Sequence, residues 1–358
     1  MQLKYKSKVI QPMQYSVFDI KNNGGEVIER LNLSKLCFGS LCMGPLQSML
    51  SVEDGAKVIL RAFEQGVNFI DTAQLYKTYS YIRRAFELLA EQSGDKNAAN
   101  KIVVSTKSYA YTMQGAKDAL DEALSELGRE YIDIFMLHEQ ESIHTLNGHI
   151  DALEYLFEMK VKNKIKAIGI STHHISGVLG AVEWNKSRKP GQGKLDVVNS
   201  IYNIKALGIC DGSEILEIRL AEMESALKIA REEDIFVLAM KVLGGGNFFA
   251  TASESLDFVL DKPFVDSIAI GMKSVLEVDA NILYFNERRF SGEYYDNKGG
   301  IGEKHLHIED WCTGCGECVK ICPANALTVD EYAVCDTQKC VLCGYCSSVC
   351  KDFSIKII

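Results

Sequence analysis

Two groups of cysteines near the C-terminus have the spacing of iron–sulfur ligands. Each group follows the pattern C-x2-C-x2-C-x3-C, and Pro323 comes directly after the first group. With this spacing, three thiolates of a run bind one [4Fe–4S] cluster, and the fourth binds the cluster of the other run. The pattern therefore predicts two [4Fe–4S] clusters. The first has the ligands Cys312, Cys315, Cys318 and Cys350, and the second has Cys340, Cys343, Cys346 and Cys322.

Zinc and disulfide bonds are the other common uses of clustered cysteines. Structural zinc sites usually take four ligands, in two pairs with a longer gap between them. Disulfides form in exported proteins, and the N-terminal segment MQLKYKSKVI lacks the apolar stretch of a signal peptide. We therefore favour the clusters, and residues 311–358 resemble a bacterial two-cluster ferredoxin.

A second set of reactive side chains lies in the N-terminal half of the chain. Asp71, Lys107 and His138 each follow a short apolar segment, and Tyr76 lies five residues after Asp71. Together such groups can donate a proton to a carbonyl oxygen. Because the ordinary pKa of tyrosine is about 10, we expect the charge of Lys107 to lower the pKa of Tyr76. Asp71 would hold the lysine, and His138 would hydrogen-bond the carbonyl oxygen.

These four residues require a scaffold that brings strand ends together. Short apolar segments alternate with helical patterns along the chain, and we predict strands at 36–39, 67–70, 102–105, 132–137, 167–170, 197–200, 236–239 and 267–270. Apolar strands of this kind suit a parallel sheet covered by helices. Eight strand–helix units in about 250 residues match a (β/α)8 barrel. A doubly wound sheet is the alternative, but residues 39–44 (GSLCMG) do not match the G-x-G-x-x-G motif favoured after its first strand.

The predicted fold class is thus α/β, a (β/α)8 TIM barrel followed by a small bacterial-type ferredoxin domain. We place the barrel at residues 1–287, a polar linker at 288–310 and the ferredoxin-like domain at 311–358. The residues before the first barrel strand are expected to form a hairpin that closes the bottom of the barrel. In such a barrel, catalytic side chains lie where strands end and loops begin.

The segments that carry these side chains resemble the catalytic tetrad of the aldo–keto reductases. The matching segments are N-F-I-D-T-A-x-x-Y at 68–76, S-T-K at 105–107 and L-H at 137–138. Other motifs of that family match at 36–39, 168–171 and 243–246, so the resemblance covers about residues 31–287. With its cysteine-rich segment, the chain resembles aldo–keto reductases that carry a C-terminal ferredoxin domain. The resemblance implies an oxidoreductase (EC 1) that binds an extended NAD(P)H molecule across the barrel mouth.

The resemblance also implies a nicotinamide-binding end, where this chain departs from the family pattern. Ser171 and Thr172 stand where the family holds the carboxamide with Ser-Asn, so Thr172 keeps a hydroxyl but lacks the amide. Asn199 stands in place of a glutamine. Met240 replaces an aromatic ring that stacks on the nicotinamide, although packing at a strand end explains it equally well. Lys241 replaces a small residue and reaches either a cofactor phosphate or solvent.

The remaining contacts implied by the resemblance involve the phosphates and the adenosine of the cofactor. The residues concerned are Gly244, Gly245, Lys273, Ser274, Glu277 and Asn281. The glycines let the backbone approach a pyrophosphate, or they form a flexible loop. Ser274 and Glu277 also fit a helix capping box. Glu277 would repel the 2′-phosphate of NADPH and Lys273 would attract it, so the choice between NAD and NADP stays open.

Several other residues with ligand chemistry are assigned no role. His173 and His174 follow the fifth strand, and we expect them to face solvent at the start of a helix. Four cysteines lie outside the two runs, where single cysteines are usually small buried hydrophobes. They are Cys37, Cys42, Cys210 and Cys335.

Length, composition and charge limit the class of protein. The 358 residues exceed one ferredoxin and leave room for one large domain. No segment approaches the roughly 18 consecutive apolar residues of a membrane span. A net charge of −9 without a basic block argues against nucleic acid as a partner. Oxygen-sensitive clusters without a signal peptide indicate a cytoplasmic protein.

These observations predict an oxidoreductase for an aldehyde or ketone, or for the corresponding alcohol. NAD(P)H would bind at the barrel mouth, and the two clusters would relay electrons or dock a redox partner protein. Nicotinamide releases two electrons as hydride whereas each cluster accepts one, and no flavin motif is visible to convert between them. The alternative is an electron-transfer or interaction protein with a catalytically idle barrel. The altered nicotinamide contacts favour that alternative, and the tetrad opposes it.

Overall fold

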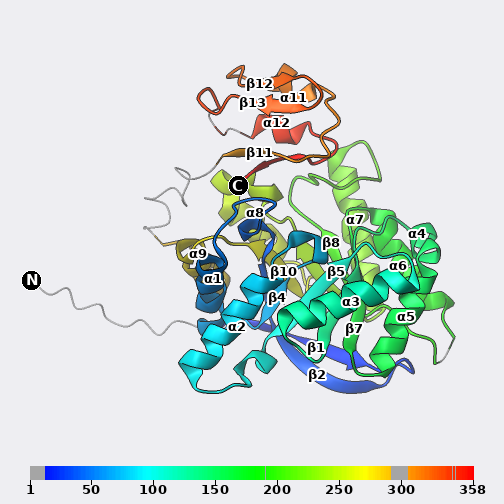
Figure 1. The fold of residues 1–358 in the computed structure, drawn as a ribbon. Helices are drawn as coiled ribbons and strands as arrows, with labels where there is room; N and C mark the ends of the chain where they lie inside the picture. Colours follow the sequence, from blue (N-terminus) through cyan, green and yellow to red (C-terminus); the bar gives the residue numbers. More distant parts are fainter. Residues whose placement is uncertain (1–12, 190, 292–304, 341, 343) are drawn as a thin grey trace, which may run out of the picture.

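The barrel predicted from the sequence is present in the computed structural model (Figure 1). The structure describes residues 13–189, 191–291, 305–340, 342 and 344–358. Eight parallel strands close into a barrel in the order β10-β3-β4-β5-β6-β7-β8-β9, so the doubly wound alternative is wrong. The strands are β3 (Leu36–Gly39), β4 (Phe69–Asp71), β5 (Val103–Ser108), β6 (Ile132–Leu137), β7 (Ile165–Thr172), β8 (Val197–Ile201), β9 (Phe236–Met240) and β10 (Ser267–Gly271).

Helices follow these strands on the outside of the barrel. They are α1 (Val52–Glu64), α2 (Tyr79–Ser93), α3 (Met113–Leu127), α4 (Ile143–Gly148), α5 (Ile150–Val161), α6 (Ile175–Ser187), α7 (Leu216–Glu232), α8 (Ala252–Leu260) and α9 (Val275–Glu287). Local sequence sets the start of α1, because the Ser51 hydroxyl accepts a hydrogen bond from the Asp54 N–H at 3.1 Å. Its apolar stripe, which includes Ala56 and Ile59, is buried against the barrel.

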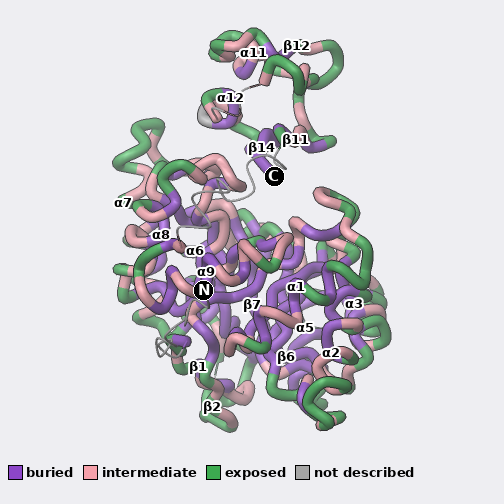
Figure 2. The backbone as a smooth tube through the Cα atoms, turned by 90° about the vertical axis from the view of Figure 1, so that its left-hand side faces the viewer, coloured by how far each residue is buried: buried purple, intermediate pink, exposed green. Residues whose placement is uncertain are grey.

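An antiparallel hairpin closes the bottom of the barrel, as the sequence predicts. β1 (Tyr15–Lys21) pairs with β2 (Val27–Ser34). Phe18 of the hairpin packs with inward-facing barrel residues, and its ring centroid lies 4.8 Å from that of Phe236. Figure 2 shows the buried backbone running through the middle of the barrel, with exposed segments around it. The hairpin therefore closes the core at one end of the barrel. A catalytic site must then lie at the other end.

The cysteine-rich segment forms a small domain against that other end of the barrel (Figure 1). β11 (Leu306–Ile308) pairs with β14 (Ile355–Ile357), and β12 (Leu327–Val329) pairs with β13 (Ala333–Cys335). Two short helices, α11 (Glu317–Ile321) and α12 (Tyr345–Ser348), complete the domain.

The predicted linker at 288–310 contains part of this folded domain. β11 lies inside it, so the paired part of the C-terminal domain begins before residue 311. Residues 292–304 of the linker lie outside the described residues. Among the helices that the structure describes, none is both long and apolar enough to cross a membrane.

Candidate functional site

Side-chain alternation places six of the predicted site residues on the inner surface of the barrel mouth. The buried cluster inside the barrel includes Phe69, Val103, Ile134, Ala167, Val197 and Leu238. Because successive side chains of a strand point to opposite faces, the residues two or four positions further on also face inward. Those residues are Asp71, Lys107, His138, Ser171, Asn199 and Met240.

Asp71 and Lys107 form a buried ion pair in the mouth. Nζ of Lys107 lies 2.7 Å from Oδ2 of Asp71 and 2.7 Å from the backbone oxygen of Thr72. The Ser105 hydroxyl donates to Oδ1 of the same carboxylate at 2.9 Å. The predicted contact between the aspartate and the lysine is therefore confirmed, and further hydrogen bonds from Ser105 and to Thr72 hold the pair in place.

Tyr76 lies beside this pair, but its pKa differs from the prediction. Nζ of Lys107 lies over the Tyr76 ring, 4.9 Å from its centroid. Burial raises the pKa of Tyr76 well above its usual value, and the negative charges of Asp71 and Glu139 raise it further. The prediction that Lys107 lowers this pKa is wrong for this form of the protein, because Asp71 neutralises the lysine at short range. Tyr76 therefore keeps its proton near neutral pH, as a proton donor must.

His138 adds a second hydrogen-bonding group beside Tyr76. Its ring stacks on that of Tyr109 with centroids 4.4 Å apart, and it meets the Tyr76 ring edge-on at 5.7 Å. Burial lowers the pKa of His138 well below 6.5, and the charges of Lys107 and Lys241 lower it further. Its imidazole is therefore neutral near neutral pH. A neutral imidazole donates one hydrogen bond, which suits the oxygen of a carbonyl group.

Asn199 presents an unpaired amide in the same mouth. It is 0% exposed, and among the described residues neither Oδ1 nor Nδ2 has a hydrogen-bond partner. A buried amide without partners costs about 1–3 kcal/mol, and both of its polar groups remain available to a ligand that donates and accepts hydrogen bonds. Ser171 neighbours Asn199 across the β7–β8 pairing, and its hydroxyl accepts from the Glu139 N–H at 2.9 Å. The Thr172 hydroxyl instead accepts from the His174 N–H at 2.9 Å, on the outer side of β7.

Met240 and Lys241 lie at the end of β9 and line the pocket. Lys241 has a φ of 56°, in the left-handed region that non-glycine residues rarely adopt. Its Nζ lies 2.8 Å from Nε2 of His173, so this histidine, which we expected to face solvent, lies against the site. Burial lowers the pKa of Lys241 to about 7, and the charge of Lys356 contributes.

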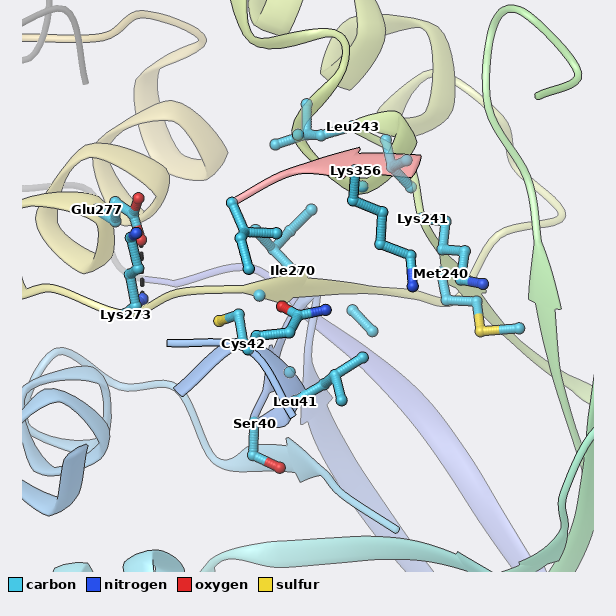
Figure 3. A pocket seen from close by; sticks show the side chains of 18 of the residues that line it. Ser40, Leu41, Cys42, Met240, Lys241, Leu243, Ile270, Lys273, Glu277 and Lys356 are labelled. Carbon is cyan, nitrogen blue, oxygen red and sulfur yellow. Dashed lines mark hydrogen bonds between the residues drawn. The ribbon is translucent and has the colours of Figure 1, made fainter. Parts of the chain in front are cut away.

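Other predicted cofactor residues also line this pocket, and Lys273 and Glu277 lie at its far end (Figure 3). Gly245, Lys273, Glu277 and Asn281 line it. Ser274 caps α9 by accepting from the Glu277 N–H at 3.2 Å, and the Glu277 carboxylate accepts from the Lys273 N–H at 2.8 Å. The Ser274 half of the predicted capping box is thus confirmed. Figure 3 shows Lys273 and Glu277 side by side, away from Met240 and Lys241.

The C-terminal domain forms one wall of the pocket. Phe353, Lys356, Ile357 and Ile358 line it together with the barrel residues, and the cavity has a volume of about 210 Å³. In Figure 3, Lys356 reaches from β14 toward the end of the pocket where Lys241 lies. Sequence reasoning missed this wall, because these residues follow the last cysteine of an otherwise ordinary ferredoxin pattern.

The glycine turn after β9 meets this wall. Gly244, Gly245 and Gly246 have positive φ values of 57°, 63° and 88°. A Cβ on Gly245 would meet Cγ of Lys356 at 3.1 Å, and a Cβ on Gly246 would overlap the carbonyl oxygen of Ile357. The turn that we expected to approach a pyrophosphate therefore approaches the C-terminal strand in this structure.

The predicted cluster ligands line two separate cavities in the C-terminal domain. One cavity is lined by Cys312, Cys315, Cys318 and Cys350. The other is lined by Cys322, Cys340 and Cys346, and the remaining member of that set, Cys343, lies outside the described residues. The fourth cysteine of each run thus crosses to the cavity of the other run, which is the grouping that the spacing predicts.

Cys335 is a further cysteine beside the second cavity, to which we assigned no role. Burial raises the pKa of its thiol to about 12, and the neighbouring Cys340 contributes to the rise. Cys335 lies on β13, which pairs with β12. No local pattern in the sequence predicted this pairing.

Comparisons with known proteins match both parts of the chain. A family model described as "Aldo/keto reductase family" matches residues 35–257, and one described as "4Fe-4S binding domain" matches residues 306–328. Methylglyoxal reductase DkgA of Yersinia pestis is 24% identical over 125 residues, which are 35% of this chain and 42% of that protein. L-galactose dehydrogenase of Arabidopsis thaliana is 23% identical over 144 residues, which are 39% of this chain and 45% of that protein. The chain thus spans less than half the length of these relatives.

Solved structures of aldo-keto reductases share the barrel fold. The holo form of an aldo-keto reductase from Bacillus halodurans matches with a TM-score of 0.57 and 17% identity, over 80% of this chain and 96% of that one. Aldose reductase from Giardia lamblia matches with a TM-score of 0.54 and 15% identity, over 75% of this chain and 91% of that one. At these identities the likeness concerns the fold alone.

Proposed function

The chain belongs to the aldo/keto reductase family, and on that premise we propose that it interconverts a small aldehyde or ketone and the corresponding alcohol, with NAD(P)H at the barrel mouth. The observation that carries this proposal is the arrangement of Tyr76 and His138 around the buried Asp71–Lys107 pair. When bound, NAD(P)H supplies a hydride, which brings both electrons of the reduction to the carbonyl carbon.

Tyr76 is the proton donor in this proposal. Its raised pKa keeps the hydroxyl protonated, and the neutral His138 donates a hydrogen bond that holds the carbonyl oxygen. As the carbonyl carbon gains the hydride, the oxygen becomes negative and takes the proton of Tyr76. Lys107, close to the tyrosine ring, stabilises the tyrosinate that remains until solvent returns a proton. In the reverse direction the tyrosinate accepts the proton of the alcohol.

The residues at the barrel mouth fit a nicotinamide cofactor. The unpaired amide of Asn199 complements a carboxamide, which also has one acceptor and one donor group, and Ser171 lies beside it. The Thr172 hydroxyl is engaged elsewhere, so we assign the carboxamide to Asn199 and Ser171. The cavity of about 210 Å³ is smaller than the roughly 300 Å³ at which pockets for drug-sized ligands begin. A whole dinucleotide therefore requires this pocket to widen.

The domain matched by the 4Fe-4S model supports an iron–sulfur centre, and we propose two clusters in the two cysteine-lined cavities. A contact between the domains favours an electron relay over a purely structural role. The Phe353 N–H donates to the Cys350 carbonyl at 3.2 Å, and the Phe353 ring lies 4.4 Å from Nζ of Lys241. One turn of chain thus connects a proposed cluster ligand to the pocket.

The proposed relay must also match the number of electrons that NAD(P)H releases to the number that each cluster accepts. A hydride carries two electrons, and each cluster takes one. Exchange between them needs a carrier that accepts two electrons and releases them singly, and a flavin has that chemistry. We therefore include a flavin as an added reactant in the test of the relay.

An anaerobic titration of the cluster-loaded protein tests the proposal. NADH and then NADPH are added with and without a flavin, and the absorbance of the nicotinamide and of the clusters is followed. Binding together with turnover of an aldehyde supports the reductase. Bleaching of the clusters supports the relay, and binding without bleaching limits the protein to hydride transfer. Failure to bind either nucleotide would favour the electron-transfer protein with an idle barrel.

A further inference from the structure

Two lysines from different domains approach each other at the reactive end of the pocket. Lys241 comes from the barrel, at the end of β9, and Lys356 comes from β14 of the C-terminal domain. Phe353 lies between them, with its ring centroid 4.4 Å from Nζ of Lys241 and 5.7 Å from Nζ of Lys356. Figure 3 shows both side chains reaching into the same part of the cavity, beside Met240.

The two lysines differ in their ion-pair partners. Glu309 forms an ion pair with Lys356 and is also 3.2 Å from His307. Lys241 has His173 as its hydrogen-bond partner, and within the described ranges of the chain no carboxylate lies at ion-pair distance from its Nζ. Burial lowers the pKa of His173 well below 6.5, so this histidine adds no charge near neutral pH. The negative charge of Glu139 acts on Lys241 only from beyond ion-pair distance, so among the described residues Lys241 is the lysine at this end of the pocket without a direct ion-pair partner.

A buried cation without a counter-charge is costly, and a bound anion relieves that cost. His173 and Phe353 occupy two sides of the Lys241 ammonium group, and the pocket lies on a further side. An anionic group that entered from the pocket would meet both Lys241 and Lys356. Tyr76 lines the same cavity, so a carbonyl group attached to that anion would lie near the proton donor.

We propose that Lys241 and Lys356 bind the anionic group of the carbonyl substrate, and that this substrate is a small oxo acid. This inference rests on the proposed reductase function and adds the substrate class. A carboxylate is favoured over the larger phosphate group because His173 and Phe353 already enclose the Lys241 ammonium group on two sides. The cofactor phosphates are assigned to the far end, where Lys273 and the start of α9 lie. Since Lys356 belongs to the C-terminal domain, docking of that domain completes the substrate site.

A matched pair of substrates tests this assignment without any mutation. Pyruvate and methyl pyruvate share the carbonyl group and differ in charge. We expect kcat/KM for pyruvate to exceed that for its ester by about 10- to 100-fold, the range of a charge-assisted hydrogen bond. Glyceraldehyde 3-phosphate and glyceraldehyde form a second pair. A preference confined to the phosphate pair, or for the neutral member of both pairs, would overturn the oxo-acid assignment.

Variants of Lys241 and Lys356 test whether these side chains cause the preference for pyruvate over its ester. We expect Lys241→Met to raise KM for pyruvate by about 10- to 100-fold with little change for the ester, and Lys356→Met to act in the same direction. Lys205→Met is the control, because Lys205 is exposed outside the pocket and the change removes the same charge. Cluster absorbance and thermal unfolding show whether each variant folds. Equal losses on acid and ester, or a rise confined to the KM of the nicotinamide, would contradict the assignment.

Binding of oxamate, an unreactive isostere of pyruvate, separates this inference from the proposed reaction. Calorimetry on the cluster-loaded protein measures it without turnover. Oxamate binding that Lys241→Met abolishes supports the subsite even if no carbonyl compound is reduced. Turnover of methyl pyruvate without oxamate binding would support the proposed reductase activity and contradict the proposed anion subsite.

Discussion

The carbonyl oxygen of Ile357 occupies the space in which any residue other than glycine at position 246 would carry its Cβ. This contact joins the last strand of the C-terminal domain to the turn after β9 of the barrel, and Gly246 has a φ of 88° there. The position thus requires glycine for two reasons, its backbone conformation and the close approach of another chain segment. The cysteine-rich domain is therefore docked by backbone contact at the barrel mouth.

Replacement of Gly246 by alanine should loosen this docking. We expect faster hydrogen exchange in β14 of the Gly246→Ala variant, because the new methyl group displaces Ile357. Gly191→Ala is the control, since Gly191 has a similar φ of 87° and, its chain neighbours apart, no atom of the described residues lies within 4 Å of the position that a Cβ would take there. The control carries the same backbone strain without the collision. Equal exchange of β14 in the two variants would show that the contact does not hold the domain.

Removal of the Tyr76 hydroxyl should stop carbonyl reduction. We expect Tyr76→Phe to lower kcat by about 10²- to 10⁴-fold, the usual contribution of a positioned proton donor. The ring remains in place, so NAD(P)H binding and cluster absorbance should not change. Tyr109→Phe is the matched control, because Tyr109 stacks on His138 but gives its hydroxyl to Glu139 at 2.7 Å. Unchanged turnover in the Tyr76→Phe variant would contradict the mechanism in which Tyr76 donates the proton.

Replacement of Asn199 should change stability and cofactor affinity in opposite directions. Asn199→Leu removes a buried amide without partners, so we expect the ligand-free protein to become more stable by about 1–3 kcal/mol. The affinity for NAD(P)H should fall, because the carboxamide of the nicotinamide loses its hydrogen-bonding partner. Asn185→Leu is the control, since both amide atoms of Asn185 bond to the backbone of Leu195 at 2.8 Å, and its loss should destabilise the protein. Denaturant unfolding and nucleotide titration measure the two effects.

Loss of single cysteines should remove different clusters. Cys318 lines the first cavity, whereas Cys322, four residues later, lines the second. We expect Cys318→Ala and Cys322→Ala each to lose about half of the iron, with different electron paramagnetic resonance signals remaining after reduction. Loss of all iron from both variants would show that the domain unfolds as a unit and would leave the two ligand sets undistinguished.

Affinity for the anionic substrate should fall as the pH rises through about 7, the pKa to which burial and the charge of Lys356 lower that of Lys241. The sign follows from the charge, because the ammonium form binds the carboxylate and the neutral amine does not. The groups that face Lys241 are His173, Glu139, Cys210, Lys356 and Glu309. His173 is neutral over this range, so it does not produce the change. KM for pyruvate should rise with pH while KM for methyl pyruvate stays constant, and parallel curves would contradict the assignment.

The sequence alone predicted the barrel, the bottom hairpin and the grouping of the cluster cysteines. Each of these predictions depends on the pattern of residues that lie close together in the sequence. Apolar segments such as 132–137 predict strands because buried parallel strands need apolar residues on both faces. The cysteine grouping follows from the reach of three thiolates on one tight loop. Side-chain alternation then places Asp71 and Lys107 on the same inner surface.

The tertiary structure alone decided the electrostatics of the site and what surrounds it. The pKa of Tyr76 rises because burial outweighs a lysine that Asp71 already neutralises, a balance set by distances that spacing along the chain does not contain. The approach of Lys356 to Lys241 depends on how two domains dock, and residues more than a hundred positions apart carry no common local signal. Sequence pattern therefore predicts which groups are present, and packing decides their charge states and their neighbours.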